Sequence, residues 1–298
     1  MALKSVFNAM KREGYVIKDL DLYLLSLNGE DNDRAIDVNA PSQIGSCLRS
    51  RYYSRTQASR DTNAVDARTR RIFDNGTKTH ERLQQYLEEQ GMLLMDEVPV
   101  YNATYNIQGH TDGILALGAV EKGVLEIKSI NSNGFSNLKT VKEEHRKQGL
   151  TYVYCLEQRR LELHEIYSSL SDFVKDKKSR YKKYASLYQH LKDGRRHTRE
   201  EKIKFQCDLH DKMDSILMET RVPITKAIFL YENKDSQELK EFCVSTREAA
   251  SQEVLKEILN ECSYINDCIK NGIVPPRCSN SKTSSPCRFC PFTIECFN

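Results

Sequence analysis

The stretch "GHTDGILALGAVEKGVLEIKS", residues 109–129, places three charged side chains within two short apolar runs. Asp112 interrupts the first run, and Glu126 and Lys128 alternate with apolar residues in the second. Successive side chains of a strand point to opposite faces, so Glu126 and Lys128 would share one face while their apolar neighbours enter the core. A turn at "GAVEKG" would place Asp112 opposite Glu126. The pattern therefore predicts two antiparallel strands whose charged groups meet at one point.

Two neighbouring carboxylates repel each other unless a cation lies between them, and oxygen ligands of this kind suit Mg²⁺ or Mn²⁺. Such a metal polarises a phosphoryl oxygen and lowers the pKa of its bound water, which creates a nucleophile for attack on a phosphodiester. Lys128 would add positive charge beside the scissile phosphate. The alternative is a solvated Glu126–Lys128 pair on a strand face, with Asp112 as a turn residue.

The surrounding sequence predicts an α/β (α+β) fold with a mixed central sheet flanked by helices. Short β-favouring runs between residues 97 and 130 indicate an antiparallel meander of about three strands, and residues 224–244 indicate a hairpin that turns at "NKDSQ". "PSQIGSCLRSRYYSR" predicts a helix that opens at Pro41 and Ser42. "NGTKTHERLQQYLEEQG" predicts a helix that starts near Thr77 or Thr79 and stops at Gly91.

A chain of 298 residues suggests one core domain with appendages, and its 39% hydrophobic and 29% charged residues argue against wholesale disorder. We expect an N-terminal appendage, a core in two parts, a basic helical insertion and a cysteine-containing tail. The boundaries, in that order, are 1–40, 41–156 with 222–270, 157–221, and 271–298. No apolar run approaches the ~20 residues needed to span a bilayer, and the first residues lack a signal-peptide pattern, so we expect no membrane partner and a cytoplasmic location.

Ten cysteines in a cytosolic chain favour metal ligation over disulfides, because that compartment keeps thiols reduced. "CRFCPFTIEC" spaces Cys287, Cys290 and Cys296 as C-x2-C-x5-C, a pattern typical of zinc or iron–sulfur sites. Both sites need a fourth ligand, for which Cys278 and Cys47 are the candidates. Four other cysteines are expected to be buried small hydrophobic residues, and a fifth, Cys207, is not assigned. The four are Cys155, Cys243, Cys262 and Cys268.

The charged cluster resembles the active site of the PD-(D/E)xK nuclease superfamily, in which an acid on one strand and an E-x-K on the next converge. Asp112 would be the motif aspartate, and Glu126 with Lys128 the E-x-K. Thr111 stands where the superfamily name has proline, but "GHTD" is similar to the G-x-x-D form of RecB-type members. "QGLTY" is similar to their Q-x-x-x-Y motif, whose members here are Gln148 and Tyr152, and His80 in "GTKTHERL" stands where these nucleases carry a helix histidine.

The resemblance implies a restriction-endonuclease-like core and a bound Mg²⁺ or Mn²⁺. Asp112, Glu126, His80 and the carbonyl of Ile127 would hold the metal. Lys128 would assist catalysis. The Q-x-x-x-Y pair would contact DNA and organise the site.

The tail is similar to that of RecB-like iron–sulfur nucleases, namely the CRISPR-associated exonucleases and AddB-type nuclease domains. These carry one cysteine before the nuclease core and a C-x2-C-x5-C after it. The resemblance thus favours a 4Fe-4S cluster held by Cys47, Cys287, Cys290 and Cys296, and the alternative is a zinc site that uses Cys278.

The predicted insertion is strongly basic: residues 175–204 contain 12 Lys and Arg but 4 Asp and Glu, with Tyr181, Tyr184 and Tyr188 among them. Cations for phosphates and rings for bases are typical of single-strand binders, and the alternative is a solvated helix face. The resemblance implies an exonuclease on single-stranded DNA with 5′ to 3′ polarity. It also implies a helicase, CRISPR-adaptation or recombination partner. The chain has no Walker lysine motif, so any unwinding of DNA would come from such a partner. The alternative function is an inactive nucleic-acid-binding adaptor on the same scaffold.

Overall fold

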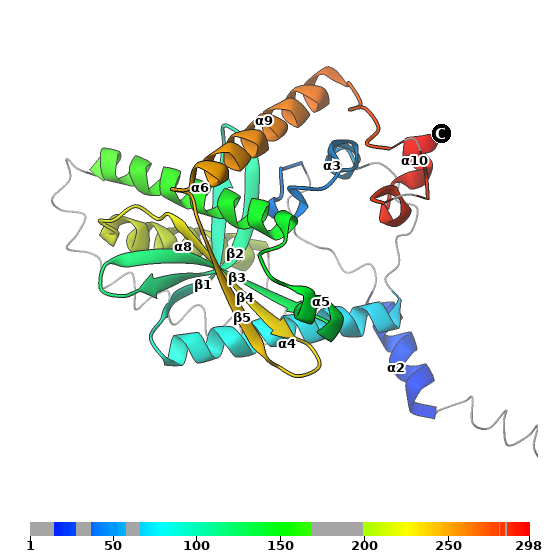
Figure 1. The fold of residues 1–298 in the computed structure, drawn as a ribbon, viewed down its shortest axis with the longest axis horizontal. Helices are drawn as coiled ribbons and strands as arrows, with labels where there is room; N and C mark the ends of the chain where they lie inside the picture. The colour runs from blue at the N-terminus through cyan, green and yellow to red at the C-terminus, as the bar shows by residue number, and fades with distance from the viewer. Residues whose placement is uncertain (1–14, 28–36, 58–65, 168–198, 280, 284) are drawn as a thin grey trace, which may run out of the picture.

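A five-stranded mixed sheet with the order β1-β2-β3-β4-β5 forms the centre of the molecule (Figure 1). The first three strands are antiparallel, β4 runs parallel to β3, and β5 is antiparallel to β4. The strands are β1 (Leu93–Asn102), β2 (Ile107–Leu117), β3 (Glu121–Ile130), β4 (Lys226–Asn233) and β5 (Leu239–Ser245). The predicted meander, the hairpin and the mixed sheet flanked by helices are confirmed. The computed structural model describes residues 15–27, 37–57, 66–167, 199–279, 281–283 and 285–298.

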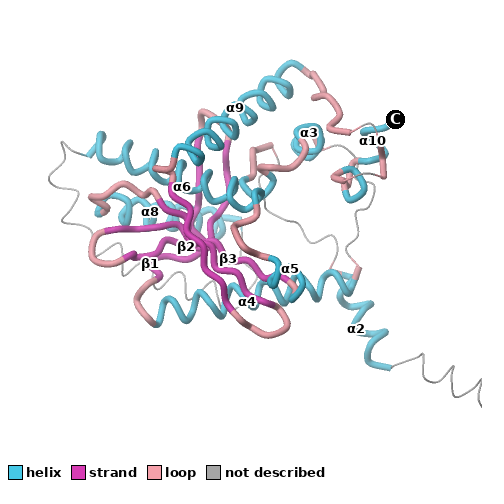
Figure 2. The backbone as a smooth tube through the Cα atoms, in the orientation of Figure 1, coloured by secondary structure: helices cyan, strands magenta, loops and turns pink. Residues whose placement is uncertain are grey.

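Helices cover both faces of the sheet, as the tube view shows (Figure 2). α4 (Ala67–Glu89) packs on one face, where Leu83 meets Leu115 and Ile127. α6 (Glu143–Tyr167) lies on the other face, where its apolar residues join the largest core cluster. α8 (Arg199–Glu219) and α9 (Ala249–Asn271) pack against α6. Because both faces of β3 are covered, its centre is buried throughout although it carries Glu126.

The remaining elements are short. They are α2 (Tyr15–Ser26), η1 (Pro41–Gln43), α3 (Leu48–Arg55), α5 (Ser132–Asn137), η3 (Cys287–Phe289) and α10 (Thr293–Phe297). The predicted helix opening at Pro41 was wrong in its extent. Pro41 starts only a single 3₁₀ turn, and the α-helix begins after Cys47.

α4 begins at Ala67, well before the predicted start at Thr77 or Thr79. Asp66 caps it, since the Asp66 carboxylate accepts a hydrogen bond from the Thr69 backbone N–H at 2.7 Å. Asn75 and Gly76, which precede the predicted start, lie within the helix. The stop was correct: the helix ends at Glu89, and Gly91 follows with a φ of +71° that favours glycine.

Gly149 sets how closely α6 approaches the sheet. A Cβ at this position would overlap the Phe229 ring and lie 3.1 Å from the Ala227 Cβ, and both residues are buried in β4. The preceding residue is Gln148, so this close contact also positions one member of the predicted Q-x-x-x-Y pair.

We therefore expect Gly149→Ala to lower the free energy of unfolding by about 1–3 kcal/mol, because the added methyl overpacks the helix–sheet interface. Urea denaturation would measure the change. Gly76→Ala is the matched control, since its Cβ would meet only the Ser129 hydroxyl at 3.8 Å and a helical alanine is favoured by about 0.5–1 kcal/mol. A Gly149→Ala protein as stable as the Gly76→Ala protein would contradict the packing argument.

The predicted basic insertion, 157–221, is described only in part. α6 continues through its first residues and α8 forms its last third, while Tyr181, Tyr184, Tyr188 and most of the basic residues lie outside the described residues. Its role in DNA binding stays a prediction. Likewise, the domain boundaries given above remain predictions.

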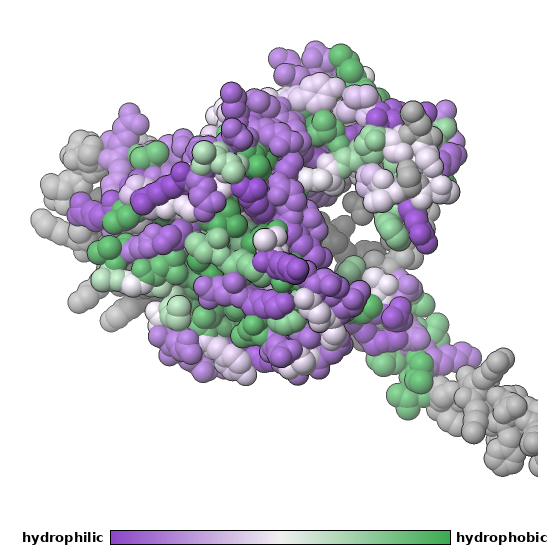
Figure 3. All heavy atoms as spheres, viewed as in Figure 1, coloured by the Kyte–Doolittle hydropathy of each residue, from purple (hydrophilic) through white to green (hydrophobic). Residues whose placement is uncertain are grey.

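α2 packs on α4 and exposes several apolar side chains, including Val16 and Ile17 (Figure 3). An ion pair joins Asp21 of α2 to Arg71 of α4. None of the described helices is long and apolar enough to cross a membrane.

Candidate active site

β2 and β3 bring the two predicted acids to the same face of the sheet. Gly113 lies opposite Leu125 in the antiparallel ladder, and extending this register by one residue places Asp112 opposite Glu126. Directly opposed side chains on such a pair have their Cβ atoms about 5 Å apart. The Asp112 carboxylate also accepts a hydrogen bond from the backbone N–H of Ile127 at 2.5 Å. The Asp112 carboxylate therefore lies beside Ile127, the residue whose carbonyl the resemblance assigns as a metal ligand.

Glu126 is a buried acid with one oxygen left unsatisfied. Its side chain is 3% exposed; Oε1 accepts from the Lys128 ammonium at 2.5 Å, and Oε2 has no hydrogen-bond partner among the described residues. Burial, followed by the charge of Asp112, raises the pKa of Glu126 to about 8, although Lys128 acts in the opposite direction. A desolvated carboxylate oxygen without a donor is costly, and a divalent cation is one partner that removes the cost.

His80 reaches this cluster from α4. Its Nδ1 lies 3.2 Å from Asp112 Oδ1. Burial acts to lower the pKa of His80, but the hydrogen bond and charge of Asp112 outweigh it and raise the pKa above its ordinary value. The helix histidine, which comes from a distant part of the sequence, thus contacts the motif aspartate.

Lys128 connects the acids to α6. Its ammonium donates to Gln148 Oε1 at 3.1 Å as well as to Glu126, and Gln148 Nε2 donates to the Tyr152 hydroxyl at 3.0 Å. Both α6 residues are buried and lie one helical turn apart. Burial, together with the charge of Glu126, raises the pKa of Tyr152, so this phenol stays protonated and able to donate. All of the predicted active-site side chains lie in one connected group.

Two further residues belong to the site and were not predicted from the sequence. Glu97 of β1 lies opposite Asp112, because its neighbours on both sides pair with those of Asp112. Gln84 of α4 donates to the Asp112 carbonyl at 2.8 Å and to Glu97 Oε1 at 3.5 Å. Glu97 has a φ of +44°, which is rare for a non-glycine residue and common where a site constrains the backbone. Burial raises the pKa of Glu97, and the negative charge of Asp112 raises it further.

A histidine–tyrosine pair borders the site on the β4 side. Tyr231 pairs with Lys128 across the parallel ladder, and its hydroxyl lies 2.7 Å from His145 Nδ1. Burial and the Lys128 charge lower the pKa of His145 to about 4, so His145 is neutral at physiological pH. Neither residue carries a motif that sequence reasoning could have used, because strand tyrosines and helix histidines are common.

The donor chemistry of this group fits Mg²⁺ or Mn²⁺. Carboxylates and a histidine are available, and Glu126 Oε2 receives no hydrogen bond from the residues that the structure describes. Among the described residues, no group of three or more His, Cys, Asp or Glu side chains is arranged to hold an ion as it stands. In this arrangement Asp112 faces His80 and the Ile127 N–H, and Glu126 faces Lys128.

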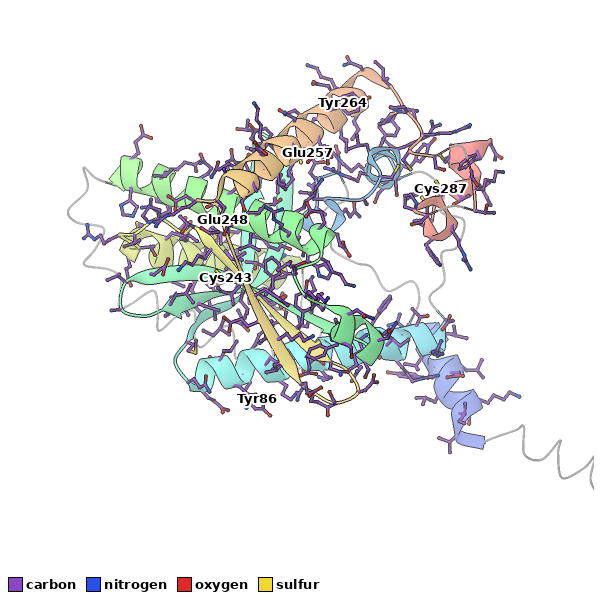
Figure 4. The ribbon with its side chains drawn as sticks, in the orientation of Figure 1. Tyr86, Cys243, Glu248, Glu257, Tyr264 and Cys287 are labelled. Carbon is purple, nitrogen blue, oxygen red and sulfur yellow. The ribbon has the colours of Figure 1, made fainter. Side chains whose placement is uncertain are left out.

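The predicted cysteine site joins the tail of the chain, where Figure 4 labels Cys287, to the region of Cys47 before α3. Cys47 caps α3 and Cys287 begins η3. The sulfur atoms of Cys278 and Cys287 are 3.9 Å apart. Burial, then hydrogen bonding to Cys47 and Cys287, raises the pKa of the Cys278 thiol to about 12. Both candidate fourth ligands, Cys47 and Cys278, therefore lie at the same place.

Apolar packing also holds this region together. Phe292 is 2% exposed and its ring centroid lies 5.9 Å from that of Tyr53 on α3. Cys290 and Cys296 pack against the same cluster.

Among the other cysteines, Cys155, Cys262 and Cys268 are buried as expected. The expectation for Cys243 was wrong, because this residue lies on the edge strand β5 and is exposed. Cys207 is also exposed.

Comparison with known proteins adds little. No family model matches the chain, and no curated protein matches it. It is similar to a solved structure described as the crystal structure of SSO0001, with 12% identity over 95% of this chain and 96% of that chain and a TM-score of 0.44. A likeness at this level supports no inference about function.

Proposed function

We propose that this chain is a metal-dependent DNA nuclease. The observation that carries the proposal is the placement of Asp112 opposite Glu126, with a buried and unsatisfied Glu126 oxygen and the Lys128 ammonium bound to the same carboxylate. A solvated charge pair, the alternative from the sequence, would not explain why Glu126 is 3% exposed.

Asp112, Glu126, His80 and the Ile127 carbonyl would hold Mg²⁺ or Mn²⁺. When bound, the cation supplies Lewis-acid polarisation of the phosphate and a water of lowered pKa. Lys128 places a proton donor beside Glu126, where it can stabilise charge on a phosphate oxygen. Gln148 accepts from the Lys128 ammonium, and Tyr152 in turn accepts from Gln148, so α6 holds the ammonium in place.

The proposed substrate is DNA, with single strands and 5′ to 3′ exonuclease polarity adopted from the family resemblance. A helicase, CRISPR-adaptation or recombination partner is proposed on the same ground. The cytoplasmic location expected from the sequence also stays a proposal. For the cysteine site we propose a 4Fe-4S cluster on Cys47, Cys287, Cys290 and Cys296, and zinc bound through Cys278 is the competing assignment.

The test is cleavage of end-labelled single- and double-stranded DNA in Mn²⁺ and in chelator. We expect Mn²⁺-dependent products from the natural sequence and a loss of rate of about 10²–10³-fold or more in Lys128→Met. Labels at either end would give the polarity.

Lys122→Met is the matched control, because Lys122 lies at the other end of the same strand. DNA binding without any metal-dependent cleavage would contradict the proposal and support the adaptor function. Equal rates for the two methionine variants would remove Lys128 from the mechanism.

A further inference from the structure

A partly apolar cavity lies away from the candidate active site. It has a volume of about 490 Å³, which is within the range of about 300–1,000 Å³ typical of small-ligand pockets. α6, α9 and the loops beside β4 and β5 enclose it. Thr225, which precedes β4, is six residues from Tyr231, the partner of Lys128. At ~3.3 Å per strand residue, the cavity and the acids are about 20 Å apart.

Two cations line the cavity without partners. Arg247 lies just before Glu248, the N-cap of α9 that Figure 4 labels, and Lys256 lies about two turns into the helix. In the described part of the chain neither side chain forms an ion pair. The one acid in the lining, Glu157, is compensated by Arg160 at 2.6 Å and accepts from the Ile224 N–H. The start of α9 adds a favourable field for an anion beside Arg247. The cavity therefore attracts negative charge.

The lining also contains a buried hydroxyl that lacks a partner. Thr225 is 9% exposed, and its Oγ1 forms no hydrogen bond within the described residues. Its neighbours are satisfied: the Thr246 hydroxyl donates to the Thr225 carbonyl, and the Ile224 N–H donates to Glu157. This oxygen is closed off from solvent, so the orphan hydroxyl costs stability as it stands.

An aromatic pair forms another wall. The rings of Tyr105 and Tyr154 meet edge to face with centroids 6.2 Å apart. Apolar side chains such as Val153 and Leu255 line the space beside them. A planar ring can stack or pack on such a surface, and nucleic-acid bases use tyrosines in this way.

We propose that this cavity binds a nucleotide, with its base against Tyr105 and Tyr154 and its phosphate at Arg247 and Lys256. Either a free nucleoside monophosphate or the terminal nucleotide of a DNA strand has this chemistry. The site is independent of the proposed nuclease function, because it uses none of the acids of that site.

Isothermal titration of the full chain with a nucleoside 5′-monophosphate tests the proposal. We expect saturable binding that is at least tenfold weaker for the nucleoside and for inorganic phosphate alone, and at least tenfold weaker in the Arg247→Gln/Lys256→Gln variant. Lys270→Gln, in the last turn of α9 and also exposed, is the matched control and should bind as the natural sequence does. A short single-stranded oligonucleotide that displaces the monophosphate would assign the site to a strand end, and failure to displace it would assign the site to free nucleotides.

Thr225→Val provides a second readout. The ligand-free variant should melt at a higher temperature, because the orphan hydroxyl is gone, while it should bind the monophosphate as the natural sequence does, because the Thr225 Oγ1 is closed off from the cavity. No binding by the natural sequence, equal binding by the double variant, or an equal loss in Lys270→Gln would overturn the proposal. Each of these results leaves DNA cleavage untouched, so it is distinguishable from a failure of the nuclease assignment.

Discussion

Replacing Glu126 by glutamine should abolish metal-dependent DNA cleavage, by about 10³-fold or more, and at the same time stabilise the metal-free protein at neutral pH. The loss of activity follows because a neutral amide binds a divalent cation poorly. The gain in stability follows because Glu126 is 3% exposed and one of its oxygens has no donor among the described residues. A purely structural acid paired with Lys128 would instead lose stability on substitution.

The raised pKa of Glu126 sets how the stability gain of Glu126→Gln should change with pH. The folded pKa of Glu126 is raised from 4.5 to about 8. The folded state therefore binds more protons than the unfolded state between these values, and stability falls as pH rises through this window. We expect the stability difference between Glu126→Gln and the natural sequence to grow to roughly 1–3 kcal/mol between pH 5 and pH 8. Chemical denaturation at several pH values in chelator would measure it.

His145 acts in the opposite direction but does not obscure the result. Its folded pKa is lowered to about 4, so its contribution is present above the unfolded pKa of 6.5 and is lost as pH falls toward 4. Both proteins carry this histidine, and its contribution cancels in their difference.

Mn²⁺ supplies the complementary measurement. A ligand present at 100 times its dissociation constant stabilises the folded state by about 2.7 kcal/mol, and this gain should appear in the natural sequence but not in Glu126→Gln. Glu121→Gln is the matched control, since Glu121 lies on the same strand in a half-exposed pair with Lys226 at 2.9 Å. Stabilisation by Mn²⁺ that survives in Glu126→Gln would refute the metal assignment.

Replacing Cys287 by serine should remove the bound metal or cluster and lower the melting temperature by about 10 °C, the equivalent of roughly 3–5 kcal/mol in a chain of this size. Cys287 is buried beside Cys278, and its region ties the tail to α3 through Phe292 and Tyr53. Visible absorbance and metal analysis of anaerobically purified protein would distinguish iron–sulfur from zinc, because zinc is colourless.

Cys47→Ser and Cys278→Ser would identify the fourth ligand, which the geometry leaves open because Cys278 neighbours both Cys47 and Cys287. The exposed Cys207→Ser serves as the control and should change neither absorbance nor melting temperature. Purified protein that contains neither iron nor zinc would disprove a metal role for the cysteines.

Local pattern was sufficient for much of the fold and for the strand-borne part of the site. Alternation in residues 107–130 predicts two strands and the shared face of Asp112 and Glu126, because side-chain direction on a strand has a period of two. The four-residue spacing of Gln148 and Tyr152 predicts a common helix face for the same kind of reason.

Other features could not be predicted from the sequence because they depend on tertiary structure. The start of α4 was missed because Asn75 and Gly76 look like a breaker, whereas packing on the sheet and the cap at Asp66 keep the helix intact. Glu97 was missed because an acid on a strand looks like any solvent-facing position until its partner strand is known. Cys243 was misassigned because an apolar sequence context does not show which strand lies at the edge.

The single helix α4 supports the site at two points. His80 contacts the Asp112 carboxylate, and Gln84, one turn further along, holds the Asp112 carbonyl. A slip of this helix by one turn, ~5.4 Å, would withdraw both contacts together. A substitution that displaces α4 should therefore remove both contacts to Asp112 at once, rather than one at a time.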